Sequence, residues 1–355
     1  MLTLFPFQVK ALETLRHKEV HLALTAPTGA GKGAILEELA ADPDERILLL
    51  TPLLALGRQQ IARFSACGIS CHSSMGKAHT SPNRSRVWIS SPESALTHRN
   101  QSEISEWKPT LIAVDEAHCL HEWGEHFRPA YLEIVPFLKR LAAKRSLWMS
   151  ATFPRQTIDH LMNEIPGRWQ TQGTFVLPAN LSIRMERIRF TERIELIHGI
   201  VKREKKPGIL FAGTRKNVEK YHRLFASAGM KAIPYHAGMS DEERRSAERI
   251  LELESETPLG GHSVIATNAF GMGMDYRQLE WALLAHTPFS ILSLMQSFGR
   301  VARAGRIGRA ELYWAEEDFR IAGYLSKRPN DLQGLRSFLE ATPSKRQALL
   351  KELLL

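Results

Sequence analysis

Short apolar runs rich in Val, Ile and Leu alternate with longer segments of helical period along most of this chain. Strands that are buried on both faces of a parallel sheet read as such runs, because helices cover the sheet. The alternation therefore predicts an α/β fold with parallel sheets. The expected strands are residues 20–26, 46–52, 86–92, 110–118 and 146–152 in a first series, and residues 208–213, 231–236, 262–268, 279–286 and 310–315 in a second.

The two series are separated by residues 166–182, which contain prolines and glycines and show little periodicity. A chain of 355 residues also exceeds what one hydrophobic core holds. We therefore expect an N-terminal domain over residues 1–175, a C-terminal domain over residues 176–325, and a helical tail over residues 326–355. The leucines near the end of the tail could pack on the second domain or meet a partner.

The charge balance of the chain indicates a polyanionic partner. Lys and Arg number 47 against 38 Asp and Glu, a formal net charge of +9, which suits nucleic acid. The three cysteines, Cys67, Cys71 and Cys119, lack the paired spacing of a disulfide framework or a zinc module. We therefore expect no zinc and a cytoplasmic location. A secretory signal and a membrane-spanning apolar run are both missing from the pattern, so no membrane partner is expected.

A glycine-rich loop lies between an expected strand and an expected helix in VHLALTAPTGAGKGAILEELA, the context that a phosphate-binding loop requires. Gly29 and Gly31 let backbone N–H groups turn toward an anion, and Lys32 would meet the terminal phosphates. The predicted loop residues are Thr28, Gly29, Ala30, Gly31, Lys32 and Gly33.

Gly33 occupies the position where a loop of this kind normally carries serine or threonine. The hydroxyl that would bind Mg²⁺ directly is therefore missing. We expect weaker metal binding and slower turnover, and an increase in turnover when Gly33 is replaced by serine.

The tetrad DEAH at residues 115–118 ends another expected strand, and the carboxyl ends of parallel strands share one edge of a sheet. Two adjacent carboxylates there can divide the work of a nucleotidase. Asp115 would hold Mg²⁺ through water, and Glu116 would orient and deprotonate the attacking water. His118 completes the predicted catalytic group of this tetrad. An acidic strand end without a task is the alternative interpretation.

The segment QSFGRVARAGR at residues 296–306 carries Arg300 and Arg303, three positions apart, and this spacing predicts one face of a helix. Arginines brought against a γ-phosphate would stabilise its developing charge. An ordinary basic surface helix is the alternative.

Taken together, these segments resemble superfamily 2 helicases, and most of all the RecQ family, over residues 4–325. The segments in the family's order are FPFQ, TAPTGAGK, TPLLAL, SSPESAL, DEAHCLHEWGEHFRPAY, MSAT, LFAGTRKNVE, AIPYHAGM, ATNAFGMGMD and QSFGRVARAG. The resemblance implies two tandem RecA-like parallel-sheet domains with a nucleotide cleft between them. It also implies ATP and Mg²⁺ as cofactors.

The segment CLHEWGEHFRPAY resembles the aromatic-rich loop by which RecQ enzymes sense single-stranded DNA. Trp123 and Phe127 could stack on bases within a few residues of Glu116, with Arg128 beside them. A core position for the two aromatic side chains is the alternative. This loop favours DNA over RNA as the ligand.

The resemblance assigns the remaining site residues by position. Adenine contact falls to Gln8, and further nucleotide contacts fall to Gly273 and Asp275. Contacts with the nucleic-acid backbone fall to Thr214, Arg215 and Thr267. Coupling between sites falls to Ser150, Thr152 and Gln296. Arg300 and Arg303 match the arginine-finger positions, although Ala302 replaces the glycine usual between them.

The expected function is that of an ATP-dependent DNA helicase or translocase, moving on single-stranded or partly duplex DNA in the 3′ to 5′ direction. The zinc-binding, winged-helix and HRDC modules of the family are not recognised in the sequence, so a protein partner could supply strand separation. One alternative is an RNA helicase, which shares the engine. Another is a nucleotide-gated clamp or accessory subunit with weak ATPase activity, which Gly33 would support.

Overall fold

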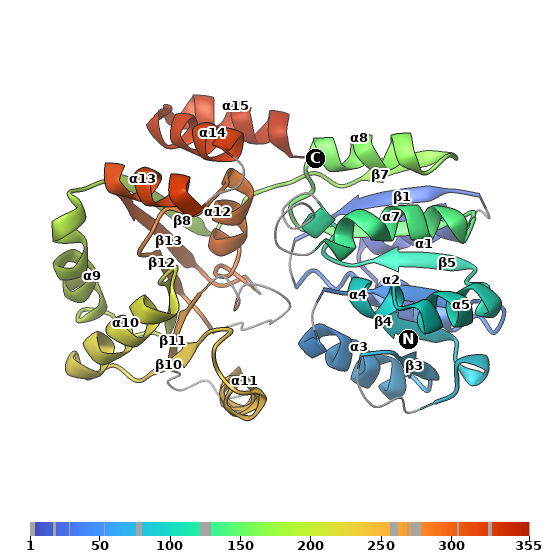
Figure 1. The fold of residues 1–355 in the computed structure, drawn as a ribbon. Helices are drawn as coiled ribbons and strands as arrows, with labels where there is room; N and C mark the ends of the chain where they lie inside the picture. Colours follow the sequence, from blue (N-terminus) through green and yellow to red (C-terminus); the bar gives the residue numbers. More distant parts are fainter. Residues whose placement is uncertain are drawn as a thin grey trace. The chain divides into compact units, whose positions relative to one another are not determined.

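The computed structural model describes residues 4–16, 19–27, 29–52, 54–75, 80–120, 129–255, 262–267, 270, 278–303, 305–325 and 329–354. The chain forms two compact units. The first is Met1–Val176 together with Leu350–Leu355, and the second is Leu177–Leu349. Each unit holds one parallel sheet with helices packed against it (Figure 1). The predicted α/β fold with two parallel sheets is confirmed.

The sheet of the first unit has the strand order β3-β4-β2-β5-β6-β1-β7. Its strands are β1 (His21–Thr25), β2 (Ile47–Leu50), β3 (Cys71–Ser73), β4 (Val87–Ser90), β5 (Leu111–Val114), β6 (Ser146–Ser150) and β7 (Trp169–Gln172). Its helices are α1 (Pro6–Arg16), α2 (Gly33–Ala40), α3 (Leu54–Ala66), α4 (Pro92–Ala95), α5 (His98–Trp107), α7 (Ala130–Arg140) and α8 (Arg155–Glu164), and Pro82–Arg84 form a 3₁₀ turn, η1.

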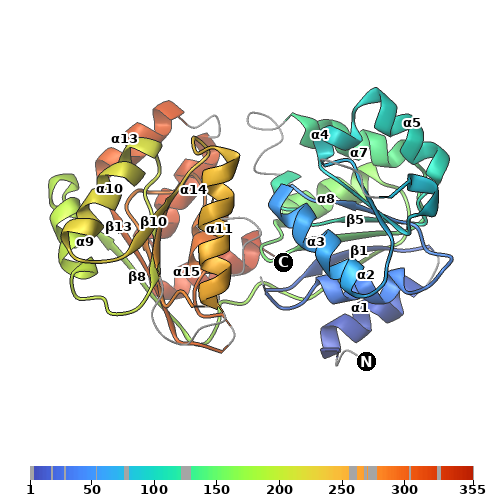
Figure 2. The same ribbon diagram turned by 90° about the horizontal axis from the view of Figure 1, so that it is seen from below.

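Helices cover both faces of this sheet, with α1, α2 and α3 on one side and α4, α5, α7 and α8 on the other (Figure 2). Alternate strand residues face opposite layers. Leu22 and Leu24 of β1 pack in one core with Leu12 of α1 and Ile35 of α2. On β4, the buried Trp88 lies edge-on to Trp107 of α5, with ring centroids 5.7 Å apart. Since both faces are buried, the strands can be apolar throughout, which is what made them visible in the sequence.

The sheet of the second unit has the strand order β10-β11-β9-β12-β13-β8. Its strands are β8 (Leu181–Arg187), β9 (Gly208–Phe211), β10 (Ala232–Tyr235), β11 (Ser263–Ala266), β12 (Trp281–Leu284) and β13 (Gly308–Trp314). The remaining elements are the 3₁₀ turn η2 (Phe190–Glu192) and the helices α9 (Arg193–Val201), α10 (Arg215–Ser227), α11 (Asp241–Ser255), α12 (Ile291–Phe298), α13 (Glu316–Leu325), α14 (Pro329–Glu340) and α15 (Pro343–Leu353).

One face of the second sheet is covered by α9 and α10, and α11 lies on the other side of β10 (Figure 2). Tyr221 and Phe225 of α10 pack in one core with Trp281 and Leu283 of β12. A buried ion pair joins Arg193, at the start of α9, to Asp318 of α13, with Nη1 2.8 Å from Oδ1. The unit is therefore held by an apolar core and by a buried charge pair at one end of its sheet.

Three strands lie outside the expected ones. β7 lies within residues 166–182, where the sequence predicts the boundary between the domains, and β8 begins at the end of that range. β7 reads WQTQ and β8 reads LSIRMER, and the residues of β8 are all half-buried or exposed. Each pairs with a single neighbour at an edge of its sheet. The third, β3, has only three residues. Short or half-exposed edge strands need no continuous apolar run, so the pattern could not reveal them.

The terminal leucines differ from the expectation that they pack on the second domain. Leu350–Leu355 group with the first unit, where Leu350 and Leu354 are buried. Leu354 forms an antiparallel bridge with Pro154, the residue before α8.

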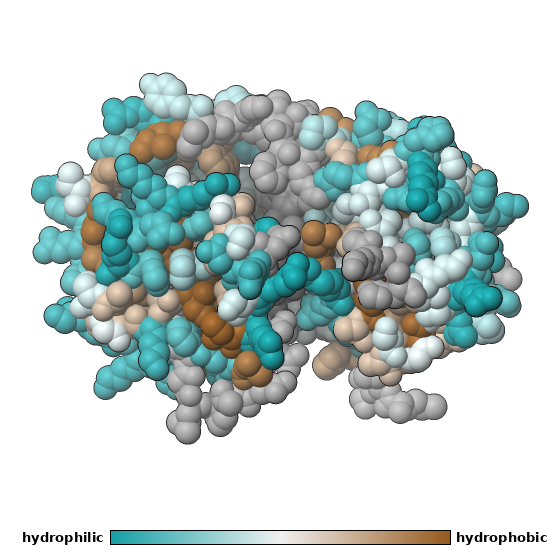
Figure 3. Space-filling model, turned by 60° about the horizontal axis from the view of Figure 1, so that its bottom comes forward, coloured by the Kyte–Doolittle hydropathy of each residue, from teal (hydrophilic) through white to brown (hydrophobic). Residues whose placement is uncertain are grey.

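The described helices include none that is long and apolar enough to cross a membrane. The face in Figure 3 is mostly hydrophilic, with hydrophobic residues in small scattered groups.

Candidate functional site

The loop between β1 and α2 has the backbone that its glycines were predicted to allow. Gly29 and Gly31 have φ values of 78° and 80°, a region that strains other residues. Ala34 N donates to Gly31 O at 3.0 Å, so α2 begins directly at the loop. The first N–H groups of a helix lack partners within it and form a ready anion site.

Lys32 stands at the amino end of α2. Its Nζ donates to Ala26 O at 2.9 Å and to Pro27 O at 3.2 Å, two carbonyls that follow β1. The ammonium therefore lies at the carboxyl edge of the sheet, where α/β proteins bind their ligands. This arrangement places a positive charge over the loop.

Gln8 ties α1 to the same loop. Its Nε2 donates to Gly31 O at 2.7 Å, and its Oε1 accepts from Phe5 N at 2.7 Å. A Cβ added to Gly31 would come within 2.9 Å of Gln8 Nε2, so the contact requires glycine. The carboxamide thus holds the loop in place, and its predicted contact with adenine stays a prediction.

The DEAH tetrad begins where β5 ends, beside β2 and β6. Asp115 N donates to Leu50 O at 2.9 Å, and Asp115 Oδ1 accepts from Glu116 N at 3.0 Å. Glu116 has a φ of 51°, which is rare and costly for a residue with a side chain. Ala117 N donates to Met149 O at 2.9 Å and helps fix the turn. The strained turn puts two neighbouring carboxylates at one sheet edge.

These carboxylates are electrostatically coupled to each other and to the loop lysine. Burial raises the pKa of Asp115 to about 6, the Glu116 carboxylate adds to the shift, and the Lys32 ammonium opposes it. A site in which two carboxylates destabilise each other favours a hard cation, and carboxylate oxygen is the protein ligand that Mg²⁺ prefers. No cluster of three potential metal-binding side chains occurs among the described residues. The residues therefore fit a magnesium ion held mainly by phosphate and water.

His118 connects the catalytic tetrad to the end of β6. Ser150 Oγ donates to Thr152 O at 3.0 Å, so it accepts from His118 Nδ1 at the same distance. Nδ1 also lies 3.3 Å from Glu116 Oε2. Burial alone lowers the pKa of His118, but Cys119 and Glu116 outweigh it and the pKa lies above its usual value. A buried chain of contacts thus runs from Glu116 to Thr152, the two ends of the predicted catalytic and coupling groups.

In the second unit, three predicted nucleic-acid contacts lie at one sheet edge. Thr214 caps α10 after β9, with Oγ1 accepting from Asn217 N at 3.2 Å, and Arg215 follows it. Thr267 follows β11, the strand beside β9. The threonine hydroxyls can still donate, so this edge offers hydroxyl, guanidinium and helix N–H donors, the groups that contact phosphates.

Arg300 and Arg303 are not on one face of a helix, so that expectation is wrong. Helix α12 ends at Phe298, and Ala302 takes a φ of 60°, which turns the chain between the two arginines. The alternative of a basic surface helix is also wrong, because both side chains are buried, at 6% and 7% exposure. Arg303 Nε donates to Gly299 O at 3.1 Å. The arginine-finger role of Arg300 and Arg303 stays a prediction. Gln296 is half-buried on α12.

Six predicted site residues lie outside the residues that the structure describes, and their roles stay predictions. They are Thr28, Trp123, Phe127, Arg128, Gly273 and Asp275. One side chain that no motif had indicated does lie at the phosphate loop. It is Arg63 of α3, whose guanidinium lies against Gly33.

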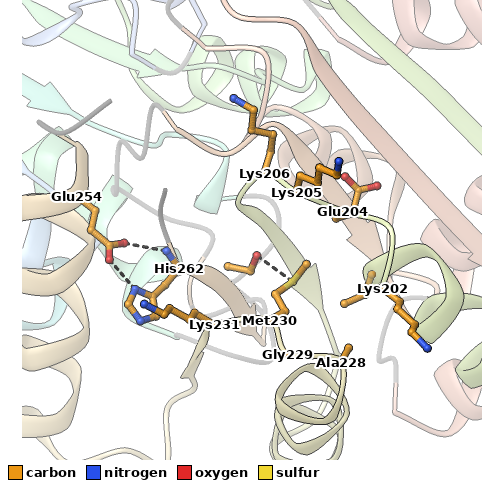
Figure 4. A pocket seen from close by; sticks show the side chains of 12 residues that line it. Lys202, Glu204, Lys205, Lys206, Ala228, Gly229, Met230, Lys231, Glu254 and His262 are labelled. Carbon is orange, nitrogen blue, oxygen red and sulfur yellow. Dashed lines mark hydrogen bonds and ion pairs between the residues drawn. The ribbon is translucent and has the colours of Figure 1, made fainter. Parts of the chain in front are cut away.

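A cavity of about 420 Å³ occurs in the second unit, at the opposite edge of its sheet (Figure 4). Its wall includes Lys206, Lys231 and His262, which precede β9, β10 and β11. Glu254 accepts from His262 N at 2.9 Å and lies 2.5 Å from its Nδ1. Lys206 extends away from this pair (Figure 4). Since ligands bind at the carboxyl ends of parallel strands, we assign this cavity no part in the reaction.

Two protein-family models and several known proteins are similar to this chain. The DEAD/DEAH box helicase model matches residues 5–161, and the helicase conserved C-terminal domain matches residues 192–305. The probable ATP-dependent DNA helicase RecS of Bacillus subtilis is 26% identical over an alignment 345 residues long, which covers 93% of this chain and 68% of that protein. For the ATP-dependent DNA helicase RecQ of the same organism, identity is 23%, over 94% of this chain and 58% of that protein.

Among solved structures, Dbp5 of S. cerevisiae bound to RNA and ADP BeF3 has the same fold, with a TM-score of 0.70 and 16% identity. The match covers 98% of this chain and 93% of that one. The chain spans about two thirds of RecS and just over half of RecQ.

Proposed function

This chain is a member of the DEAD/DEAH box helicases with a RecQ-like core, and on that premise we propose that it hydrolyses ATP to move along single-stranded DNA. The observation that carries the proposal is that Lys32, whose Nζ donates to carbonyls after β1, and Asp115 and Glu116, which follow β5, lie at the carboxyl edge of one parallel sheet. A phosphate-binding lysine beside two carboxylates is the arrangement that hydrolysis of a nucleoside triphosphate needs.

Each residue has a definite task in this proposal. The loop N–H groups and Lys32 bind the phosphates, and Asp115 holds Mg²⁺ through water. The metal, when bound, neutralises charge on the phosphate oxygens. Glu116 orients the attacking water and accepts its proton. His118 Nδ1, 3.3 Å from Glu116 Oε2, keeps that carboxylate in position and links it to Ser150.

DNA is the proposed ligand, and 3′ to 5′ is the proposed direction of movement. The Bacillus subtilis relatives are named DNA helicases, and the segment CLHEWGEHFRPAY resembles the DNA-sensing loop of RecQ enzymes. Thr214, Arg215 and Thr267 would hold the backbone of the strand. RNA is the alternative ligand, since Dbp5 binds it with the same fold. Strand separation of a duplex would require a protein partner or a further segment.

The test is a steady-state ATPase assay with single-stranded DNA and RNA of equal length. We expect DNA to stimulate hydrolysis more strongly than RNA. Glu116→Gln removes the general base and should lower the stimulated rate by about 10²–10⁴-fold. Stronger stimulation by RNA would identify an RNA helicase instead. A wild-type rate no higher than that of Glu116→Gln would leave a nucleotide-gated clamp as the better description.

A further inference from the structure

The space beside Gly33 is filled by a guanidinium group. A Cβ added to Gly33 would lie 2.8 Å from Arg63 Nη1, 3.1 Å from Cζ and 3.3 Å from Nη2. All three distances are shorter than an ordinary van der Waals contact, so any side chain at position 33 would displace the guanidinium. The observed position of the Arg63 guanidinium therefore requires glycine at position 33.

Glu37 fixes the guanidinium in this place. Arg63 Nε lies 2.9 Å from Glu37 Oε1, and Glu37 is four residues after Gly33, on the same face of α2. The Glu37 side chain is 8% exposed and that of Arg63 is 42% exposed. The ion pair uses Nε, whereas Nη1 and Nη2 are the nitrogen atoms that lie beside Gly33. Glu37 thus holds one side of the group, and the side toward the phosphate loop can donate to a ligand.

We propose that Arg63 replaces the missing hydroxyl of the phosphate loop by binding the phosphates of the nucleotide directly. This inference rests on the proposed nucleotide site. A guanidinium is permanently charged and donates two parallel hydrogen bonds to phosphate oxygens, a geometry that a lysine cannot copy. It cannot bind Mg²⁺, so it acts on the phosphates and not on the metal. Nucleotide affinity should therefore depend less on Mg²⁺ than in a loop with serine or threonine.

This arrangement reverses the sequence-based expectation for Gly33→Ser. The new Cβ would push Nη1 from its place, so the variant gains a hydroxyl but moves the guanidinium away from its observed position beside the loop. We now expect no increase in turnover from Gly33→Ser alone. The double variant Gly33→Ser with Arg63→Ala has room for the hydroxyl and should bind nucleotide only when Mg²⁺ is present.

The test is equilibrium titration of the full chain with a fluorescent ATP analogue, once in EDTA and once with Mg²⁺. We expect wild type to bind in both, and Arg63→Ala to lose about 10- to 100-fold in affinity in EDTA, as for a hydrogen bond to a charged group. Arg63→Lys keeps the charge but not the paired donors and should fall between the two. Arg99→Ala is the matched control, since Arg99 forms an exposed ion pair with Glu103 on α5.

Arg63→Gln keeps most of the side-chain volume and serves if the alanine variant unfolds, with circular dichroism as the check. Equal affinity of wild type, Arg63→Ala and Arg63→Gln in EDTA would overturn the inference and leave the proposed ATPase untouched. Absence of nucleotide binding by wild type under both conditions would overturn the proposed function as well. The two failures are therefore distinguishable.

Discussion

Two residues of the DEAH tetrad are in energetically unfavourable states. Glu116 takes a left-handed φ, and Asp115 keeps a carboxylate in a site where burial and a like charge disfavour it. Such strain persists only where the surroundings fix it, and it is typical of functional sites. The hydrogen bonds from Asp115 N to Leu50 and from Ala117 N to Met149 supply that support from β2 and β6.

Asp115→Asn should make the folded chain more stable at neutral pH. The folded pKa of Asp115 is raised from 3.8 to about 6, so folding is penalised once the carboxyl ionises, and stability falls as pH rises through that window. Asparagine cannot ionise. A shift of about 2 pKa units corresponds to about 3 kcal/mol, at about 1.4 kcal/mol per unit, so we expect a gain of up to about 3 kcal/mol at pH 7.5. At pH 4 the gain should nearly vanish.

Thermal unfolding without Mg²⁺ at the two pH values measures this difference. A gain in melting temperature that is the same at pH 4 and pH 7.5 would contradict the role of ionisation. Asp159→Asn, on α8 and outside the site, provides the control for loss of a carboxylate.

Single elements owe their positions to contacts that sequence motifs do not encode. Arg193 Nη1 donates to Asp318 Oδ1 at 2.8 Å and to Ala285 O at 3.0 Å, and Thr287 Oγ1 donates to Asp318 Oδ2 at 3.1 Å. These bonds join α9, the segment after β12, and α13. Both charged side chains are almost fully buried, at 5% and 6% exposure.

Asp318→Ala should destabilise the chain by about 3–5 kcal/mol, because it leaves the Arg193 guanidinium buried without its counter-charge. Glu186→Ala is the control: it breaks the exposed pair between Arg184 and Glu186 and should cost at most about 1 kcal/mol. Urea denaturation followed by circular dichroism gives both values. Similar losses in the two variants would mean that the buried pair adds no more than a surface pair.

Strands buried on both faces could be predicted from the sequence, because a strand with two buried faces is apolar at consecutive positions. β1, β2, β5 and β6 were predicted for this reason, and with them the edge that carries Lys32 and Asp115. β8 could not be predicted in this way, because it is a half-exposed edge strand and its sequence contains no continuous apolar run. The turn at Ala302 was not predicted, because two arginines three positions apart fit a helix but do not require one.

The contact between Arg63 and Gly33 shows a further limit. The two residues are 30 positions apart, and only the packing of α3 beside α2 brings them together. The sequence indicated that something was unusual at Gly33, but it held no signal for the side chain that fills the space. A sequence motif therefore reveals the unusual glycine at position 33 but does not reveal the Arg63 guanidinium that lies beside it.

At the scale of the whole molecule, the net charge of +9 indicates a polyanionic ligand but does not say where it binds. In the second unit, the sheet edge with Thr214, Arg215 and Thr267 is the best-defined candidate. The Arg215 guanidinium lies against Gly238, where an added Cβ would come within 2.8 Å of Nη1. A glycine on the loop after β10 thus leaves the guanidinium room at this edge.

If Arg215 contacts a phosphate of single-stranded DNA, Arg215→Ala should weaken binding for every base sequence and also reduce its dependence on salt. Each phosphate neutralised on a single strand adds about 0.7 to the slope of log affinity against log salt concentration. The variant should therefore lose about that much slope, whereas Arg223→Ala should not, because Arg223 is an exposed residue two turns further along α10. Fluorescence anisotropy with labelled oligonucleotides between about 50 and 200 mM salt measures the slope for both variants. Over this range, 6–10 phosphate contacts on duplex DNA change affinity by ~10³–10⁵-fold, so a lost contact is detectable. Equal slopes for wild type and Arg215→Ala would place the nucleic-acid backbone elsewhere on the chain, because lost affinity without lost slope indicates a structural defect and not a missing phosphate contact.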